Sequence, residues 1–110
     1  MISQRDIALL SFPFSDLKSS KVRPVIVISN DGYNKKSEDM IVVPMTANLK
    51  IKEYAFLVTN SDLESGKLIK DSKVKVDRIF SVSPKIIRMK IGKVKEEIMK
   101  QVKEELYKLF

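Results

Sequence analysis

Short apolar runs separated by polar or turn-forming residues occupy the first 94 positions of the chain. Runs of four to eight such residues, rich in valine and isoleucine, are typical of β-strands. The pattern predicts strands over residues 7–12, 24–29, 41–45, 54–58 and 72–79, and a further one over 86–94. Residues 25–28 are all apolar, which indicates burial on both faces. Residues 72–79 alternate, which indicates a half-exposed strand.

Turn and capping residues punctuate these strands. Asn30-Asp31-Gly32 and Ser65-Gly66 predict turns, and Ser83-Pro84 predicts an N-cap followed by a one-turn helix. Residues 14–20 are polar and form a loop between the first two strands. Pro44 lies near the end of its strand, where a missing N–H implies a sheet edge or a bend.

The last segment changes to a helical period. Apolar residues recur there every three or four positions, with lysine and glutamate between them: Val94, Ile98, Val102, Leu106 and Leu109 or Phe110. This spacing predicts an amphipathic helix of about 15 residues that packs on the sheet. The expected fold is mainly β, a small barrel with a C-terminal helix, and residues 1–110 form one domain because a second core would be too small.

Histidine and cysteine are both absent from the sequence. Their absence excludes Ser-His-Asp and Cys-His enzymes, disulfide frameworks, and zinc sites built from thiolates or imidazoles. No apolar run approaches the roughly 20 residues that cross a bilayer, and residues 1–6 lack the apolar core of a signal peptide. We therefore expect a cytoplasmic protein with no membrane partner.

The chain is basic, with 21 lysines and arginines against 14 acidic residues and a net charge of +7. Such a domain suits a polyanion such as a nucleic acid, or an acidic protein partner. The alternative is a solubilising surface combined with a coding bias towards lysine, glutamate and isoleucine. Charge alone does not decide between the two.

Polar residues at strand ends are the candidates for chemistry. They are Arg23, Thr46, Asn48, Lys75, Asp77 and Arg78. Arg23 is either a solvated charge that flanks an apolar strand and opposes aggregation, or a guanidinium that binds a phosphate. Thr46 is either an ordinary strand residue or a hydrogen-bond donor in a site. Asp77 is either a solvated carboxylate or a proton acceptor.

Several stretches of sequence point to a known family. QRDIA at residues 4–8 leads to Phe12-Pro13, and KVRPVIVISN follows at 21–30. Then come VVPMTAN at 42–48, residues 68–79 containing KVKVDRI, and IGKV at 91–94 before the closing helix. In this order and spacing, the stretches resemble the MazF/PemK (Kid) family of toxin endoribonucleases over essentially the whole chain.

The resemblance implies an SH3-like barrel, a homodimer and cleavage of single-stranded RNA at short sequences, under the control of an acidic antitoxin protein. Arg23 and Thr46 match the catalytic arginine and threonine of the family. Asp77 and Lys75 fall at positions with acid–base roles, with lysine in place of arginine at 75. Arg5 stands where glycine is common, and Arg78 where glutamine is frequent. The implied reaction proceeds through the RNA 2′-hydroxyl and needs no metal or other cofactor.

An open barrel face with basic loops suits exposed bases and phosphates. The expected RNA-binding residues are Lys18, Ser20, Lys21, Asn48, Lys50 and Arg78. Phe14 and Tyr54 either stack on bases or belong to the core and rim of the barrel. Two rival functions remain open: a non-catalytic barrel that binds RNA or an acidic protein, and a structural protein of the ribosome or nucleoid.

Overall fold

The computed structural model describes residues 2–13 and 20–110, which form an eight-stranded antiparallel sheet and two α-helices. The strands are β1 (Asp6–Pro13), β2 (Ser20–Val27), β3 (Met40–Thr46), β4 (Ala55–Val58), β5 (Leu63–Gly66), β6 (Ser72–Lys75), β7 (Phe80–Val82) and β8 (Ile87–Val94). The helices are α1 (Asp31–Lys36) and α2 (Glu96–Tyr107), with single 3₁₀ turns at η1 (Asn60–Asp62), η2 (Val76–Arg78) and η3 (Pro84–Ile86).

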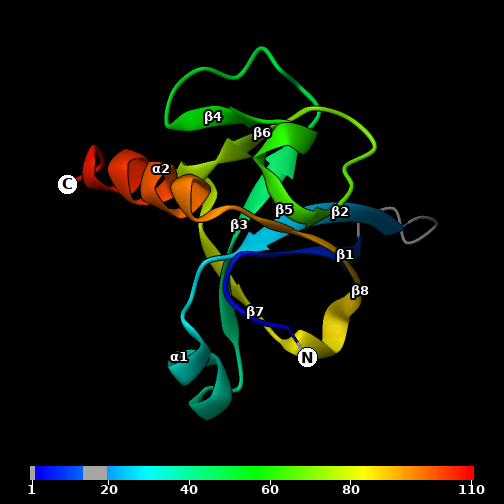
Figure 1. Ribbon diagram of the computed structural model, residues 1–110. Coiled ribbons are helices and arrows are strands. Elements are labelled where there is room, and N and C mark those ends of the chain that lie inside the picture. The colour runs from blue at the N-terminus through cyan, green and yellow to red at the C-terminus, as the bar shows by residue number, and fades with distance from the viewer. Residues whose placement is uncertain (1, 14–19) are drawn as a thin grey trace.

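The strands follow the order β4-β6-β3-β2-β1-β8-β5, with β7 paired to β3 (Figure 1). Strand β3 changes partner along its length: residues 40–42 pair with β7, and Met45 and Thr46 pair with β6. Pro44 lies at this change, where its missing N–H interrupts the ladder without leaving a buried donor unpaired. Pro44 pairs with Val25 and so lies inside the sheet, at the change of partner, and not on the edge strand that was one of the two expectations.

Two apolar clusters fill the space on either side of the central strands. The major core contains Ile7, Ile26, Val43, Met45, Val58, Leu63, Leu68, Val74, Val76, Val94, Ile98 and Val102. The minor core contains Ala8, Leu10, Val25, Val27, Met40, Val42 and Val82. Successive residues of β2 and β3 alternate between the two cores, as the strand period of two requires. The central strands are thus buried on both faces over residues 25–27 and 42–43.

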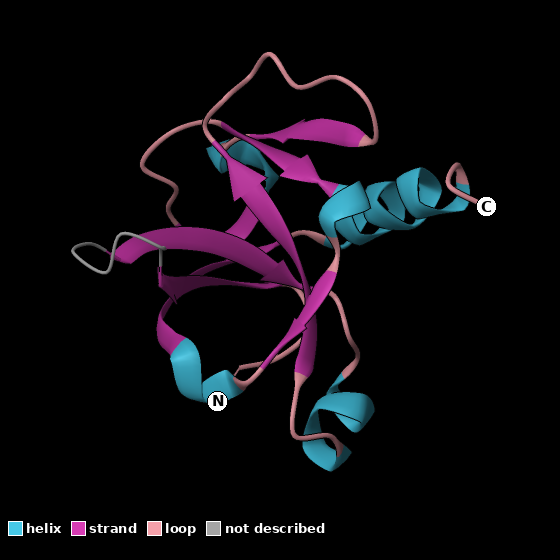
Figure 2. Cartoon of the chain, turned by 180° about the vertical axis from the view of Figure 1, so that it is seen from behind, coloured by secondary structure: helices cyan, strands magenta, loops and turns pink. Residues whose placement is uncertain are grey.

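The two helices play different parts in the packing (Figure 2). Helix α2 lies against the sheet and contributes Ile98 and Val102 to the major core. Helix α1 projects from the opposite end of the molecule, and none of its residues is buried. Within the described part of the chain, no helix combines the length and apolar character needed to span a membrane.

A buried carboxylate joins the N-terminal segment to β8. Asp6 is fully buried, and its Oδ2 accepts a hydrogen bond of 2.8 Å from the backbone N–H of Ser3. The ammonium groups of Lys90 and Lys93 lie 3.1 and 3.8 Å from its Oδ1. Two cations and a backbone donor thus compensate the cost of burying this charge.

Arg5 adopts a left-handed backbone conformation, with a φ of 77°. Its N–H donates to the carbonyl of Val27 at 2.8 Å, and its carbonyl accepts from Val94 at 2.9 Å. The guanidinium also donates to the Val94 carbonyl at 3.0 Å. Since glycine adopts this conformation without steric cost, the backbone at Arg5 suits the glycine that the resemblance implies at this position.

The structure confirms the expected fold class, a mainly β half-barrel with a C-terminal helix. All six predicted strands are present, with boundaries shifted by a few residues. The predicted cap is also present: the Ser83 hydroxyl accepts from the N–H of Lys85 at 3.2 Å, at the start of η3.

Four local predictions were wrong. Asn30 caps α1 through its side chain instead of opening a turn, and Ser65-Gly66 belong to β5. The strand expected over 72–79 ends at Lys75, because Val76 turns into the major core and starts η2. The last helix begins at Glu96, since Val94 still pairs with Leu63 in the sheet.

Candidate active site

Arg23 and Thr46 come from adjacent strands near one end of the sheet. Strands β2 and β3 pair from Val27↔Val42 to Val25↔Pro44. The same antiparallel register, carried two residues further, aligns Arg23 with Thr46. On its other side Arg23 pairs with Leu10 of β1. The two strands therefore bring the arginine and the threonine of the two sequence motifs to neighbouring positions.

The two side chains share a face of the sheet because residues two apart in a strand point the same way. Val25 and Val27 follow Arg23 along β2 and belong to the minor core, and Val42 of β3 belongs to the same core. Arg23 is exposed and Thr46 half-buried. The opposite face of the same strands carries an apolar groove lined in part by Pro24 and Met45. The polar groups are thus gathered on the rim of the minor-core face.

The hydroxyl of Thr46 is held by the turn that follows it. Its Oγ1 accepts a hydrogen bond of 3.2 Å from the N–H of Asn48, and Asn48 Oδ1 in turn accepts 3.1 Å from the N–H of Lys50. Because a hydroxyl carries one proton and two lone pairs, the Thr46 proton stays available for an external acceptor. Asn48 likewise keeps its amide NH₂ for a ligand, so both side chains are arranged as donors.

Lys73 of β6 lies directly opposite Thr46 and completes a row across five strands. We call this the Thr46 row; in strand order it contains Leu10, Arg23, Thr46, Lys73 and Leu57. Lys75 follows on the same face and pairs with Ala55 of β4. Among the described residues, neither Lys73 nor Lys75 takes part in an ion pair. Lys73 is not among the predicted site residues, because in the sequence it looks like the exposed member of an alternating strand.

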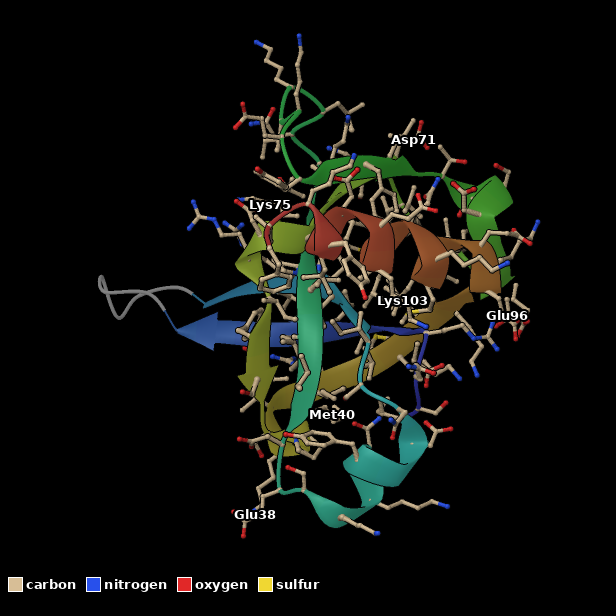
Figure 3. All side chains as sticks on the ribbon, turned by 90° about the vertical axis from the view of Figure 1, so that its left-hand side faces the viewer. Glu38, Met40, Asp71, Lys75, Glu96 and Lys103 are labelled. Atoms are coloured by element: carbon tan, nitrogen blue, oxygen red, sulfur yellow. The ribbon has the colours of Figure 1, made fainter. Side chains whose placement is uncertain are left out.

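Asp77 and Arg78 lie in η2, between the two strands that pair with β3. Since β6 pairs at Met45–Thr46 and β7 at residues 40–42, η2 passes the intervening part of β3. Both side chains are exposed. Figure 3 shows Lys75, just before η2, far from Glu38 and Met40 at the other end of β3. The fold thus brings Asp77 and Arg78 beside the strand that carries Thr46.

The remaining predicted residues are only partly described. Lys18 and Phe14 lie outside the described residues, and Ser20 and Lys21 are described only as backbone of β2, paired with Pro13 and Phe12. Asn48 and Lys50 are exposed in the turn after β3. Tyr54 is half-buried, and its carbonyl accepts from the N–H of Val76 at 2.9 Å. Tyr54 belongs to neither apolar core and lines an open pocket together with Lys52 and Glu105.

A family model for PemK-like, MazF-like toxins of type II toxin–antitoxin systems matches residues 3–110. The chain belongs to this family. The match spans the Thr46 row from Leu10 to Lys73 as well as helix α2. The resemblance carried by the five sequence stretches is thereby confirmed.

Solved structures with the same fold include several MazF proteins. A MazE–MazF structure from Deinococcus radiodurans is 19% identical, with a TM-score of 0.80 over 98% of this chain and 94% of the other. Mycobacterium tuberculosis toxin MazF-mt6 is 18% identical, with a TM-score of 0.74 over 94% of both chains. An endoribonuclease in complex with its cognate antitoxin, from a mycobacterial species, is 18% identical, with a TM-score of 0.74 over 98% and 93%.

These likenesses establish that the chain has the MazF fold over nearly its whole length. At this level of identity they carry no information on individual residues. In this PemK-like, MazF-like toxin, the role of each side chain is therefore inferred from its position in the chain's own sheet. In the Thr46 row, β3 ends at Thr46, whereas Arg23 lies inside β2 and not at the strand end that the sequence predicted.

Proposed function

We propose that this protein is a toxin endoribonuclease that cleaves single-stranded RNA at short specific sequences. The proposal rests on the β2–β3 register, which is observed as far as Val25↔Pro44 and, extended by two residues, sets Arg23 opposite Thr46, in a chain of the PemK-like, MazF-like toxin family. Two of the similar structures are described as endoribonucleases, which supports the same activity here.

RNA supplies the nucleophile. The 2′-oxygen attacks the adjacent phosphorus, an O2′–P bond forms, and the P–O5′ bond breaks. The products are a 2′,3′-cyclic phosphate and a 5′-hydroxyl. Arg23 stabilises the negative charge that develops on the phosphorane, because its planar guanidinium can bind two phosphate oxygens at once. Thr46 donates its free proton to a phosphate oxygen and holds the group in line for attack.

Two protons must move during this reaction. Asp77 is the proposed base that accepts the proton of the 2′-hydroxyl, since it is the carboxylate that η2 brings beside β3. Lys75 precedes it by two residues and is the proposed donor of a proton to the leaving 5′-oxygen. No step in this scheme needs a metal ion, because the substrate carries its own nucleophile and arginine neutralises the charge.

The protein also has proposed partners. The basic residues Lys18, Lys21, Lys50 and Arg78, with Ser20 and Asn48, guide single-stranded RNA along the rim. An acidic antitoxin competes for the same surface, and the net charge of +7 speeds its capture. MazE–MazF complexes with the same fold support such a partner. The functional unit is a cytoplasmic homodimer, which sedimentation of the pure protein tests by its mass.

The decisive experiment treats a long RNA with the pure protein in the presence of EDTA and separates the products on a denaturing gel. We expect cleavage at a few sites, with cyclic phosphate ends. Arg23→Ala and Thr46→Ala should each lower the rate at least about tenfold, which corresponds to roughly 1.4 kcal/mol of transition-state stabilisation.

Lys103→Ala on the exposed side of α2 is the matched control and should cleave like the wild type. Binding of RNA without cleavage would favour a non-catalytic barrel. Full activity of a folded Arg23→Ala protein would refute the proposed role of the Thr46 row, and activity lost on adding EDTA would refute the metal-free scheme.

A further inference from the structure

We propose that Lys73 is a further catalytic residue, whose ammonium group binds the scissile phosphate from the side of Thr46 opposite Arg23. The inference rests on the proposed RNA cleavage and adds a contact to which the resemblance assigns no role. Lys73 opens the KVKVDRI stretch on a third strand, but the roles implied there fall on Lys75 and Asp77.

The strand register sets the geometry. Thr46 pairs with Lys73 on β6, and the extended β2–β3 register aligns Thr46 with Arg23. Neighbouring strands lie about 4.8 Å apart, so the backbones of Arg23 and Lys73 are about 10 Å apart with Thr46 between them. Aligned cross-strand residues point to the same face. Two long cationic side chains therefore flank a short hydroxyl, and a phosphate above Thr46 lies within reach of both.

The alternation of β6 fixes which of its residues face this side. Ser72 and Val74 are buried, and Val74 belongs to the major core. Lys73 and Lys75 are half-buried on the opposite face, the face of Thr46. Partial burial limits the freedom of the lysine stem and lowers the entropy lost when the ammonium binds an anion.

Within residues 2–13 and 20–110, no carboxylate forms an ion pair with Lys73. The described ion pairs lie elsewhere: two join Asp6 of β1 to Lys90 and Lys93 of β8, one joins Arg5 to Glu64 of β5, and one joins Glu105 to Lys108 at the end of α2. A half-buried cation without an acidic partner attracts an anionic ligand more strongly than a fully solvated one, because solvent screens it less. A phosphate between Lys73 and Arg23 would supply that missing negative charge.

Lys75 occupies a different place in the same site. It pairs with Ala55, and the β3–β6 register extended by one residue sets it opposite Pro44 rather than Thr46. It thus lies one step nearer to η2 and Asp77. The two lysines of β6 therefore have different roles in this proposal. Lys73 binds the phosphate beside Thr46, and Lys75 faces the leaving 5′-oxygen.

The test compares Lys73→Met, which keeps the stem and removes the charge, with Lys73→Arg, which keeps the charge. Cleavage sites mapped on a long RNA define a short oligonucleotide for single-turnover kinetics. We expect Lys73→Met to lower the cleavage rate at saturating protein at least about tenfold, and Lys73→Arg to restore it to within about threefold of wild type.

Binding is measured separately on the same oligonucleotide with a 2′-deoxy nucleotide before the cleaved bond. Loss of one phosphate contact should reduce the slope of log K against log salt by about 0.7 in Lys73→Met. Lys103→Met removes one charge from α2 and should leave both rate and slope unchanged; the two residues are on separate elements (Figure 3 labels Lys103).

The outcomes separate the inference from the proposed function. A wild-type protein that cleaves no RNA would overturn the function itself. Active wild type, with Lys73→Met within twofold of it and with an unchanged salt slope, would overturn only the role of Lys73. Circular dichroism verifies that each variant is folded, and Lys73→Gln provides a second neutral variant if the methionine perturbs β6.

Discussion

Two pairs of lysines on two strands of this sheet have opposite electrostatic surroundings. On β8, Lys90 and Lys93 lie 3.1 and 3.8 Å from one oxygen of the fully buried Asp6. On β6, Lys73 and Lys75 face the side of Thr46, and no described carboxylate forms an ion pair with them. The first pair neutralises an internal charge, whereas the second leaves a positive charge at the rim.

The lysines of β8 stabilise the fold, whereas the lysines of β6 are the ones that we propose to bind RNA. Both pairs contribute equally to the net charge of +7, so composition cannot distinguish them. The difference comes from what each strand faces: the N-terminal segment at β8, and open solvent beside Thr46 at β6. It follows that lysine replacements should affect stability on one strand and RNA cleavage on the other.

The largest expected loss of stability comes from the double variant Lys90→Met, Lys93→Met. It leaves the Asp6 carboxylate buried with only Ser3 as a partner, and an uncompensated buried charge costs about 3 kcal/mol. Urea unfolding followed by circular dichroism at one fixed protein concentration measures the change. Adding Asp6→Ala to this variant should recover part of the loss, and no recovery would show that the lysines stabilise the fold by packing alone.

Asp6→Ala by itself should cost about 2 kcal/mol in the same assay. The loss is smaller because the freed lysines, whose side chains are 42% and 22% exposed, can turn to water. Asp6→Asn keeps an oxygen that can accept from Ser3 N–H and should fall between wild type and Asp6→Ala. A cost for Asn equal to that for Ala would contradict this division between charge and hydrogen bonding.

The smallest expected change in stability belongs to Lys73→Met, Lys75→Met. Without carboxylate partners in the described structure, these lysines should change the free energy of unfolding by less than about 0.5 kcal/mol. RNA cleavage should nevertheless fall more in this variant than in Lys90→Met, Lys93→Met, once each is measured well below its unfolding midpoint. Equal effects of the two double variants on both stability and cleavage would abolish the distinction between the two strands.

Much of the fold could be predicted from the sequence, because strands with buried faces have a strong period. The run at 25–28 and the alternation from Ser72 both correspond to strands. The prediction failed where one residue type serves two structures. Asparagine is common both in turns and at helix N-caps, so Asn30 alone does not distinguish the two. Helix α1 has no buried residue, so no apolar pattern in the sequence indicates that a helix follows Asn30. Val94 fits the helical period but pairs with Leu63, a contact that is visible only in three dimensions.

The candidate site was predictable only in part. Arg23 and Thr46 stand inside motifs with a family pattern, so their expected positions could be stated in advance, and their roles stay predictions. Lys73 lies in the KVKVDRI stretch, but the resemblance gives it no role, and a lysine between a serine and a valine in an alternating strand is usually a solvated residue. Its position opposite Thr46 depends on the register between β3 and β6, which are separated by β4 and β5 along the chain.

Helix α2 has a consequence for when the protein can act. Its Ile98 and Val102 share the major core with Met45 and Val74, the immediate sequence neighbours of Thr46 and Lys73. Contacts between such distant parts of a chain form late in folding. During translation, Arg23 and Thr46 leave the ribosome long before the helix that supports their strands from behind. If the proposed RNA cleavage needs the folded sheet, we expect the nascent chain to cleave no RNA until the helix has been synthesised and has docked.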